Sequence, residues 1–259
     1  MDSPMELNCD LSAAVGYTSP LQISRVLSEA WFRRNGFCLA CDCEALEQTA
    51  NNTKACDFVC RICSGSYELK TFRRKPAKRL IDGAYGALVS RLQCGVAPTL
   101  MLMERNSGWS ISGLTAIHPL FLTPDIVEKR KPLSPAARRA GWVGCNIRLD
   151  LMGSDATIEI IKGGVARPRE SVREQFRKFN RLREVPLERR GWMTLTLSVL
   201  RALHRPEFSL AEIYSREHLF SSVYPNNRNI RAKVRQQLQA LRDLGYLEFC
   251  GAGTYRLLL

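Results

Sequence analysis

Asp57 and the triplet Glu68-Leu69-Lys70 combine the side chains that metal-dependent phosphodiester hydrolysis uses. Carboxylate oxygens are the ligands that Mg²⁺ takes, and a bound cation polarises a phosphate and offsets the charge that develops on it. A lysine ammonium beside them can orient or help deprotonate the attacking water and stabilise the transition state. The pattern predicts catalytic roles for Asp57, Glu68 and Lys70, with Mg²⁺ held by Asp57 and Glu68.

The cysteines around this motif have the spacing of a zinc site. Two Cys-x-x-Cys pairs are separated by 18 residues, within the spacing that is typical of zinc ligands. Four thiolates complete a tetrahedron with no open position, which indicates a structural rather than a catalytic Zn²⁺. The predicted ligands are Cys38, Cys41, Cys60 and Cys63. The alternatives are four unrelated buried cysteines, or an exchange with Cys43 or Cys56 nearby.

The second cysteine pair lies between Asp57 and Glu68. If Cys60 to Cys63 forms the turn of a hairpin, Asp57 and Glu68 fall opposite one another on paired strands. Strand alternation then places Glu68 and Lys70 on one face and turns Leu69 into the core. An Asp…Glu-x-Lys match also occurs by chance, and by itself it is more often a solvated strand face.

Hydrophobic periodicity places these motifs among helices and strands. Helices are expected at 21–34 and 81–92, the second after a basic loop at 72–79. Strands are expected at 67–71, 98–104, 111–117 and 157–161. The Pro- and Arg-rich stretch at 129–144 is expected to be an exposed loop or short helix. Residues 167–188 are highly charged and thin in large apolar side chains, which indicates a linker that ends near Pro186. The predicted domains are therefore 1–186 and 187–259.

The C-terminal residues have the outline of a winged helix-turn-helix domain. A helix is expected at 193–203, and Ser209 is a plausible N-cap, with Glu212 three residues on, for a short helix to His218. A longer helix at 227–244 would stop at Gly245, a good C-terminal signal. Two short alternating strands follow, at 246–249 and 254–257.

The helix at 227–244 has the composition of a recognition helix. Ile230, Val234, Leu238 and Leu241 mark its core stripe. The opposite face carries Arg228, Asn229, Ala232, Arg235, Gln236 and Gln239. Asn and Gln pair with adenine edges, and Arg pairs with guanine or phosphate. The alternatives are a polar face that is merely hydrated, or a winged helix that contacts protein.

The charge of the chain favours a polyanionic partner. The 38 Lys and Arg residues exceed the 25 Asp and Glu residues, giving a formal net charge of +13, and neutralising phosphates releases condensed counterions. An anionic membrane is the competing partner, but no apolar run approaches the roughly 20 residues of a spanning helix. The first residues do not have the pattern of a secretory signal. We expect a cytoplasmic protein that binds nucleic acid, without a membrane or an obligate protein partner.

Several stretches together resemble the DpnI-type methyl-directed restriction endonucleases. They are Asp57-Phe58-Val59-Cys60, Glu68-Leu69-Lys70, Asp82-Gly83-Ala84-Tyr85, Lys131 to Pro135, Arg138 to Asn146, Arg235 to Gln239 and Leu241 to Asp243. The resemblance implies an α/β fold: a mixed-sheet PD-(D/E)xK nuclease domain with structural zinc, followed by a winged helix. It implies cleavage of double-stranded GATC that carries N6-methyladenine. Both domains would read the methylated site.

The resemblance also assigns residues. Asp57, Glu68 and Lys70 match the catalytic positions, and Trp142 matches an aromatic residue in a DNA-facing segment of the nuclease domain. A flat ring there could sense the methyl group or wedge a groove, and the alternative is a core anchor. The DNA-contacting residues are then Arg138, Arg139, Trp142, Arg228, Asn229, Arg231, Arg235 and Gln236.

The sequence departs from the family in three places. Cys56 stands where proline commonly precedes the aspartate, the loop after Lys70 is more basic, and Arg228-Asn229 begins the recognition helix differently. The last departure bears on the recognition sequence. Two other functions fit the sequence: a zinc and winged-helix regulator that binds DNA without cutting it, or a nuclease of the same fold with another target.

Overall fold

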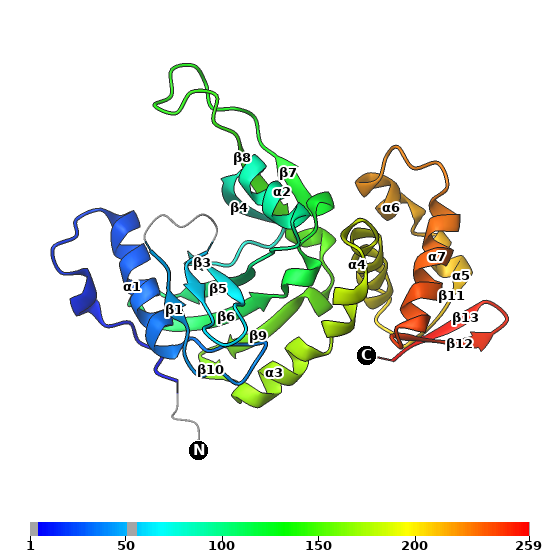
Figure 1. Ribbon diagram of the computed structural model, residues 1–259, viewed down its shortest axis with the longest axis horizontal. Coiled ribbons are helices and arrows are strands. Elements are labelled where there is room, and N and C mark those ends of the chain that lie inside the picture. The colour runs from blue at the N-terminus through cyan, green and yellow to red at the C-terminus, as the bar shows by residue number, and fades with distance from the viewer. Residues whose placement is uncertain (1–4, 51–55, 259) are drawn as a thin grey trace. The chain divides into compact units, whose positions relative to one another are not determined.

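The computed structural model describes residues 5–50 and 56–258 (Figure 1). The chain forms two compact units, each built from segments that are separate in the sequence. The first comprises Met1–Ala77, Cys94–Leu122 and Thr157–Asn180, and the second comprises Lys78–Gln93, Thr123–Ala156 and Arg181–Leu259.

A mixed β-sheet forms the centre of the first unit. Its strands, in spatial order, are β1 (Glu47–Gln48), β2 (Phe58–Val59), β3 (Ser66–Phe72), β5 (Thr99–Arg105), β6 (Ile111–Ile117), β9 (Thr157–Lys162) and β10 (Val165–Ala166). β3 and β5 run parallel, and the other neighbouring strands are antiparallel. The four strands expected from the sequence are confirmed as β3, β5, β6 and β9.

The helix α1 (Pro20–Asn35) packs its apolar stripe against the core of the first unit. Pro20 lies in the first turn, where its missing N–H costs nothing. Leu27, Trp31 and Phe32 are buried at helical spacing, and the Trp31 indole donates to the Glu6 carbonyl at 2.7 Å. The expected helix at 21–34 is therefore confirmed. Short 3-10 turns lie at η1 (Leu11–Ala14) and η2 (Pro119–Phe121).

The charged segment at 167–188 is not a linker, so that expectation was wrong. It forms α3 (Arg169–Arg177) and a 3-10 turn, η6 (Asn180–Glu184), and then enters α4 (Leu187–Arg201). Four of its apolar side chains recur three or four residues apart and are buried: Val172, Phe176, Phe179 and Leu182. The segment therefore contains an amphipathic helix, and its narrow apolar stripe is enough to pack it against the hydrophobic core despite its low apolar content.

A small antiparallel sheet of the second unit corrects another expectation. Its order is β4 (Arg79–Ala84), β8 (Gly144–Arg148) and β7 (Val127–Lys129), and the helix expected from residue 81 begins only at α2 (Tyr85–Gln93). Leu80 and Asp82 are buried while Ile81 is 65% exposed, which is the alternation of a strand. The 3-10 turns η3 (Pro124–Ile126), η4 (Leu149–Leu151) and η5 (Ser154–Ala156) complete this region.

The C-terminal part of the second unit is a winged helix. Its elements are α4, β11 (Glu207–Ser209), α5 (Leu210–Tyr214), α6 (Glu217–Val223), α7 (Ile230–Asp243), β12 (Leu247–Gly251) and β13 (Thr254–Leu257). The strands form an antiparallel sheet in the order β11-β13-β12. The expected cap is confirmed, since Ser209 and Glu212 form a reciprocal capping box. The expected helix to His218 is divided into α5 and α6.

The α/β fold with a mixed sheet and a C-terminal winged helix is thus the one that the sequence predicted. Within residues 5–50 and 56–258, no helix combines the length and the apolar character that crossing a membrane requires.

Candidate metal centres and nucleic-acid interface

The four paired cysteines meet at one point in the first unit. Their sulfur atoms all lie within 4.8 Å of one another, with Cys38 Sγ 3.5 Å from Cys63 Sγ and Cys41 Sγ 3.6 Å from Cys60 Sγ. One pair follows α1, and the other forms the turn between β2 and β3. A closed set of four sulfur donors fits a structural Zn²⁺. The cluster could therefore hold the predicted ion.

The two other cysteines near the cluster are turned elsewhere. The Cys43 thiol donates to the Ala45 carbonyl at 3.0 Å, and the Cys56 thiol donates to the Phe58 carbonyl at 3.4 Å. Neither belongs to the group of sulfur atoms that meet. The geometry therefore favours the ligand set that the knuckle spacing predicted.

Tyr67 on β3 forms hydrogen bonds with the first cysteine knuckle. Its hydroxyl donates to Cys38 Sγ at 3.2 Å and accepts from the Leu39 N–H at 2.9 Å. Burial raises the pKa of Tyr67 far above its ordinary value, and the nearby charge of Cys38 adds to this effect. The phenol therefore keeps its proton and serves as a hydrogen-bond donor to a sulfur of the candidate zinc site.

Arg173 on α3 braces the segment that carries the first cysteine pair, and no sequence pattern predicted it. Its side chain is 6% exposed. Its guanidinium donates to the Cys38 carbonyl at 3.1 Å, the Cys43 carbonyl at 3.3 Å and the Glu44 carboxylate at 2.8 Å. The apolar spacing of α3, which the charge of the segment obscured, was the signal that could have found it.

Replacing Arg173 with methionine is expected to lower the free energy of unfolding by about 2 to 4 kcal/mol, because the Cys38 and Cys43 carbonyls and the Glu44 carboxylate each lose a hydrogen bond from a buried guanidinium. Arg177→Met is the matched control. Arg177 lies on the same helix, but it makes more exposed ion pairs with Asp42 and Glu170, so its loss should cost less than about 1 kcal/mol. Urea unfolding of the zinc-loaded protein measures both. Equal losses in the two variants would contradict the role of Arg173.

Asp57, Glu68 and Lys70 come together where β2 and β3 pair. Phe58 pairs with Tyr67, so Asp57 lies opposite Glu68, as the hairpin argument predicted. The Asp57 N–H donates to the Tyr67 carbonyl at 2.8 Å, and Asp57 Oδ2 accepts from the Leu69 N–H at 2.7 Å. Hydrogen bonds to the main chain of β3 thus hold both the backbone and the carboxylate of Asp57 in place.

The two charged side chains of β3 lie on the same face of the strand. Lys70 Nζ is 2.5 Å from Glu68 Oε1, and the side chains are 22% and 9% exposed. Leu69 packs against the hydrophobic core on the other face. The two carboxylates supply the oxygen donors that Mg²⁺ takes, and the ammonium is beside one of them. The donor set therefore fits the predicted cation, and the catalytic roles stay a prediction.

The helix α7, which the sequence analysis expected at 227–244, has the two faces that the sequence predicted. Its core stripe is buried: Ile230, Val234, Leu238 and Leu241. Its exposed residues include Arg231, Ala232, Arg235, Gln236 and Gln239. Two of the arginines are braced by neighbouring elements, since Arg231 donates to Glu217 at 2.8 Å and Arg235 donates to the Tyr214 hydroxyl at 2.5 Å.

The start of this helix differs from the expectation. α7 begins at Ile230 rather than at 227, because the Asn227 side chain accepts from the Asn229 N–H at 2.8 Å and Asn229 has a non-helical backbone. Arg228 and Asn229 are therefore exposed residues of the turn before the helix.

Arg138, Arg139 and Trp142 lie in a long segment between β7 and β8 that projects from their sheet (Figure 1). Both arginines are exposed. The Trp142 ring is half-buried: a Cβ on Gly144 would approach it to 2.8 Å, and the Arg139 guanidinium lies 4.9 Å from its centroid. Trp142 is thus neither a fully buried core anchor nor a free aromatic ring.

Family models match nearly the whole chain. Residues 5–185 match the DpnI model of the Dam-replacing family, and residues 188–257 match the Dam-replacing HTH domain. The second match agrees with the winged helix, and the two together agree with the resemblance of the chain to DpnI-type enzymes. The chain belongs to the Dam-replacing family of DpnI.

Proposed function

We propose that the protein is a methyl-directed type II restriction endonuclease that cleaves double-stranded DNA at GATC containing N6-methyladenine. The observation that carries the proposal is the convergence of Asp57, Glu68 and Lys70 at the β2–β3 pair, in a chain of this family. Membership supports a restriction nuclease in broad terms. The target sequence and the dependence on Mg²⁺ are the finer part of the proposal.

Asp57, Glu68 and Lys70 would each have a separate role in phosphodiester hydrolysis. Asp57 and Glu68 would hold Mg²⁺, which when bound polarises the phosphate and offsets its developing charge. Lys70 orients the attacking water and stabilises negative charge in the transition state. The water oxygen forms the new bond to phosphorus, the leaving oxygen departs as the bond to it breaks, and a proton passes to that oxygen.

DNA recognition would be shared between two regions. The exposed Arg and Gln side chains of α7 suit a helix in the major groove. The Arg138–Trp142 segment would supply a second contact, with Trp142 close to the methyl group. We further propose that residues 1–186 act as the zinc-containing nuclease domain and residues 187–259 as the winged-helix domain.

A regulator that binds DNA without cutting it is the competing function. The intact Asp57, Glu68 and Lys70 set favours the nuclease, because a regulator has no use for this arrangement. A nuclease with an unmethylated or different target is the second competitor, and the exposed Arg228-Asn229 turn is the feature that bears on it.

One experiment separates these functions. The purified protein is incubated with Mg²⁺ and one plasmid, prepared in an adenine-methylated and an unmethylated form. We expect cleavage of the methylated form only, with ends that map to GATC. Cleavage of neither form would refute the nuclease, and equal cleavage of both would refute methyl dependence.

A further inference from the structure

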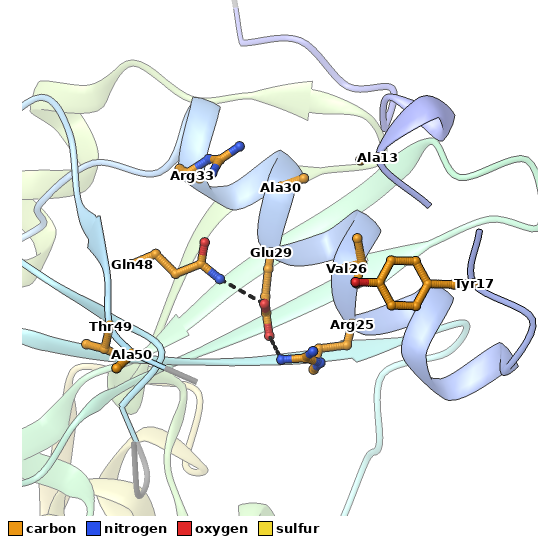
Figure 2. A pocket seen from close by; sticks show the side chains of 10 residues that line it. All are labelled: Ala13, Tyr17, Arg25, Val26, Glu29, Ala30, Arg33, Gln48, Thr49 and Ala50. Atoms are coloured by element: carbon orange, nitrogen blue, oxygen red, sulfur yellow. Dashed lines mark hydrogen bonds and ion pairs between the residues drawn. The ribbon is translucent and has the colours of Figure 1, made fainter. Parts of the chain in front are cut away.

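A groove of about 540 Å³ lies between α1 and the edge strand β1 (Figure 2). Its polar lining comes from the turn before α1, from α1 itself and from β1 with the residue that follows it. These residues are Tyr17, Arg25, Glu29, Arg33, Gln48 and Thr49. The groove belongs to the first unit, and none of its residues was identified from the sequence.

The carboxylate of Glu29 organises one wall of the groove. Gln48 Nε2 donates to Glu29 Oε2 at 2.8 Å, and Arg25 Nη1 lies 3.6 Å from Glu29 Oε1, so the carboxylate sits between the two side chains (Figure 2). Burial raises the pKa of Glu29, the positive charge of Arg25 opposes this effect, and the negative charge of Asp57 adds to it.

Thr49 connects the groove directly to the two residues that precede β2. Its N–H donates to the Asp57 carbonyl at 2.9 Å, and its hydroxyl donates to the Cys56 carbonyl at 2.6 Å. Paired strands lie about 4.8 Å apart. The groove therefore begins one strand away from Asp57, and a DNA strand with a phosphate at Asp57 and Glu68 would continue past it.

Two guanidinium groups give the groove its positive charge. Arg25 and Arg33 are exposed on α1, and eight residues of helix separate them by about 12 Å along the axis. In the described part of the chain, Arg33 makes no hydrogen bond or ion pair, whereas its neighbour Arg34 is bound to Asp10 at 2.7 Å. Arg33 is thus available to an anion from outside the protein.

We propose that this groove binds the sugar–phosphate backbone of the DNA strand being cut, next to the scissile phosphate. Arg33 and Arg25 contact phosphates, and Glu29 positions Arg25 and Gln48. The inference rests on the proposed function, because it places the scissile phosphate at Asp57. Contacts of this kind fix the position of the strand and carry no sequence information.

The test compares Arg33→Gln with Arg34→Gln. Both substitutions remove one positive charge from the same turn of α1, but only Arg33 lines the groove. The affinity for a duplex with methylated GATC is measured against salt concentration without Mg²⁺. Each lost phosphate contact reduces the slope of log K against log salt by about 0.9. We expect this reduction for Arg33→Gln, about twice as much for Arg25→Gln/Arg33→Gln, and the wild-type slope for Arg34→Gln.

Phosphate-ethylation interference on the same duplex locates the contact. Interference at one phosphate beside the cleavage position should disappear in Arg33→Gln and persist in Arg34→Gln. An Arg33→Gln slope and interference pattern equal to those of the wild type would overturn the groove assignment, even if the wild type cuts methylated plasmid. If the wild type fails to cut but Arg33→Gln still reduces the salt dependence of binding, the proposed nuclease activity is wrong and the groove remains a DNA-binding site.

Discussion

Replacing Lys70 with alanine is expected to reduce the rate of DNA cleavage by about 10³-fold while binding to methylated DNA persists. The ammonium lies 2.5 Å from Glu68 and is largely buried, so no neighbouring cation on the strand replaces it at that position. Binding persists because α7 and the Arg138–Trp142 segment are unchanged. Single-turnover cleavage with Mg²⁺ and fluorescence anisotropy without it measure the two properties separately.

Lys162→Ala is the matched control for this experiment. Lys162 is also a strand lysine paired with a glutamate, Glu159, at 3.0 Å, but its side chain is 74% exposed. The Lys162→Ala variant should cleave at the wild-type rate, since an exposed ion pair of this kind contributes little to stability. If Lys70→Ala cleaved as fast as Lys162→Ala, the assignment of the site to Asp57, Glu68 and Lys70 would be wrong.

Removing the structural metal is expected to unfold the first unit rather than to act as simple inhibition. Binding of Zn²⁺ to a four-cysteine site contributes about 10 kcal/mol or more to folding, which is comparable with the whole net stability of a typical domain. Because the Cys60–Cys63 turn joins β2 to β3, its loss separates Asp57 from Glu68. Cleavage should then stop even when Mg²⁺ is abundant.

The measurement combines circular dichroism, thermal melting and native mass spectrometry before and after chelation. We expect one Zn²⁺ per chain, and a loss of structure that zinc but not Mg²⁺ restores. Cys60→Ser should behave like the chelated protein, whereas Cys94→Ser, an exposed cysteine outside the cluster, should not. A chelated protein that keeps the wild-type melting temperature would contradict the structural role.

The candidate site was predictable because it depends on short-range patterns. The spacing of the two cysteine pairs predicts a turn at Cys60–Cys63. A hairpin turn places the residues on either side of it opposite one another. Asp57 and Glu68 follow from this geometry, and Lys70 follows from strand alternation. The buried strand β5 was equally clear, because a short continuous apolar run is typical of a strand that is buried on both faces.

The elements that were missed depend on contacts distant in the sequence. β4 forms because it pairs with β8, more than 60 residues away, and local composition favoured a helix. α3 docks through an apolar stripe between charged residues, and its buried Arg173 is stabilised by carbonyls of residues 38 and 43. The groove beside Asp57 needs α1 and β1 together, so no single segment of sequence indicates it.

Because Tyr67 bonds to Cys38, the four-cysteine cluster sets which residues of β3 face the core and which face away from it. Tyr67 is tied to Cys38 on one face, so the next residue must face the other way. A slip of one position would turn both charged side chains into the core and the apolar ones outward. The segment from Cys63 to Glu68 therefore cannot gain or lose a single residue without exchanging the two faces. The number of residues between the cluster and Glu68 therefore decides on which face of β3 the carboxylate lies.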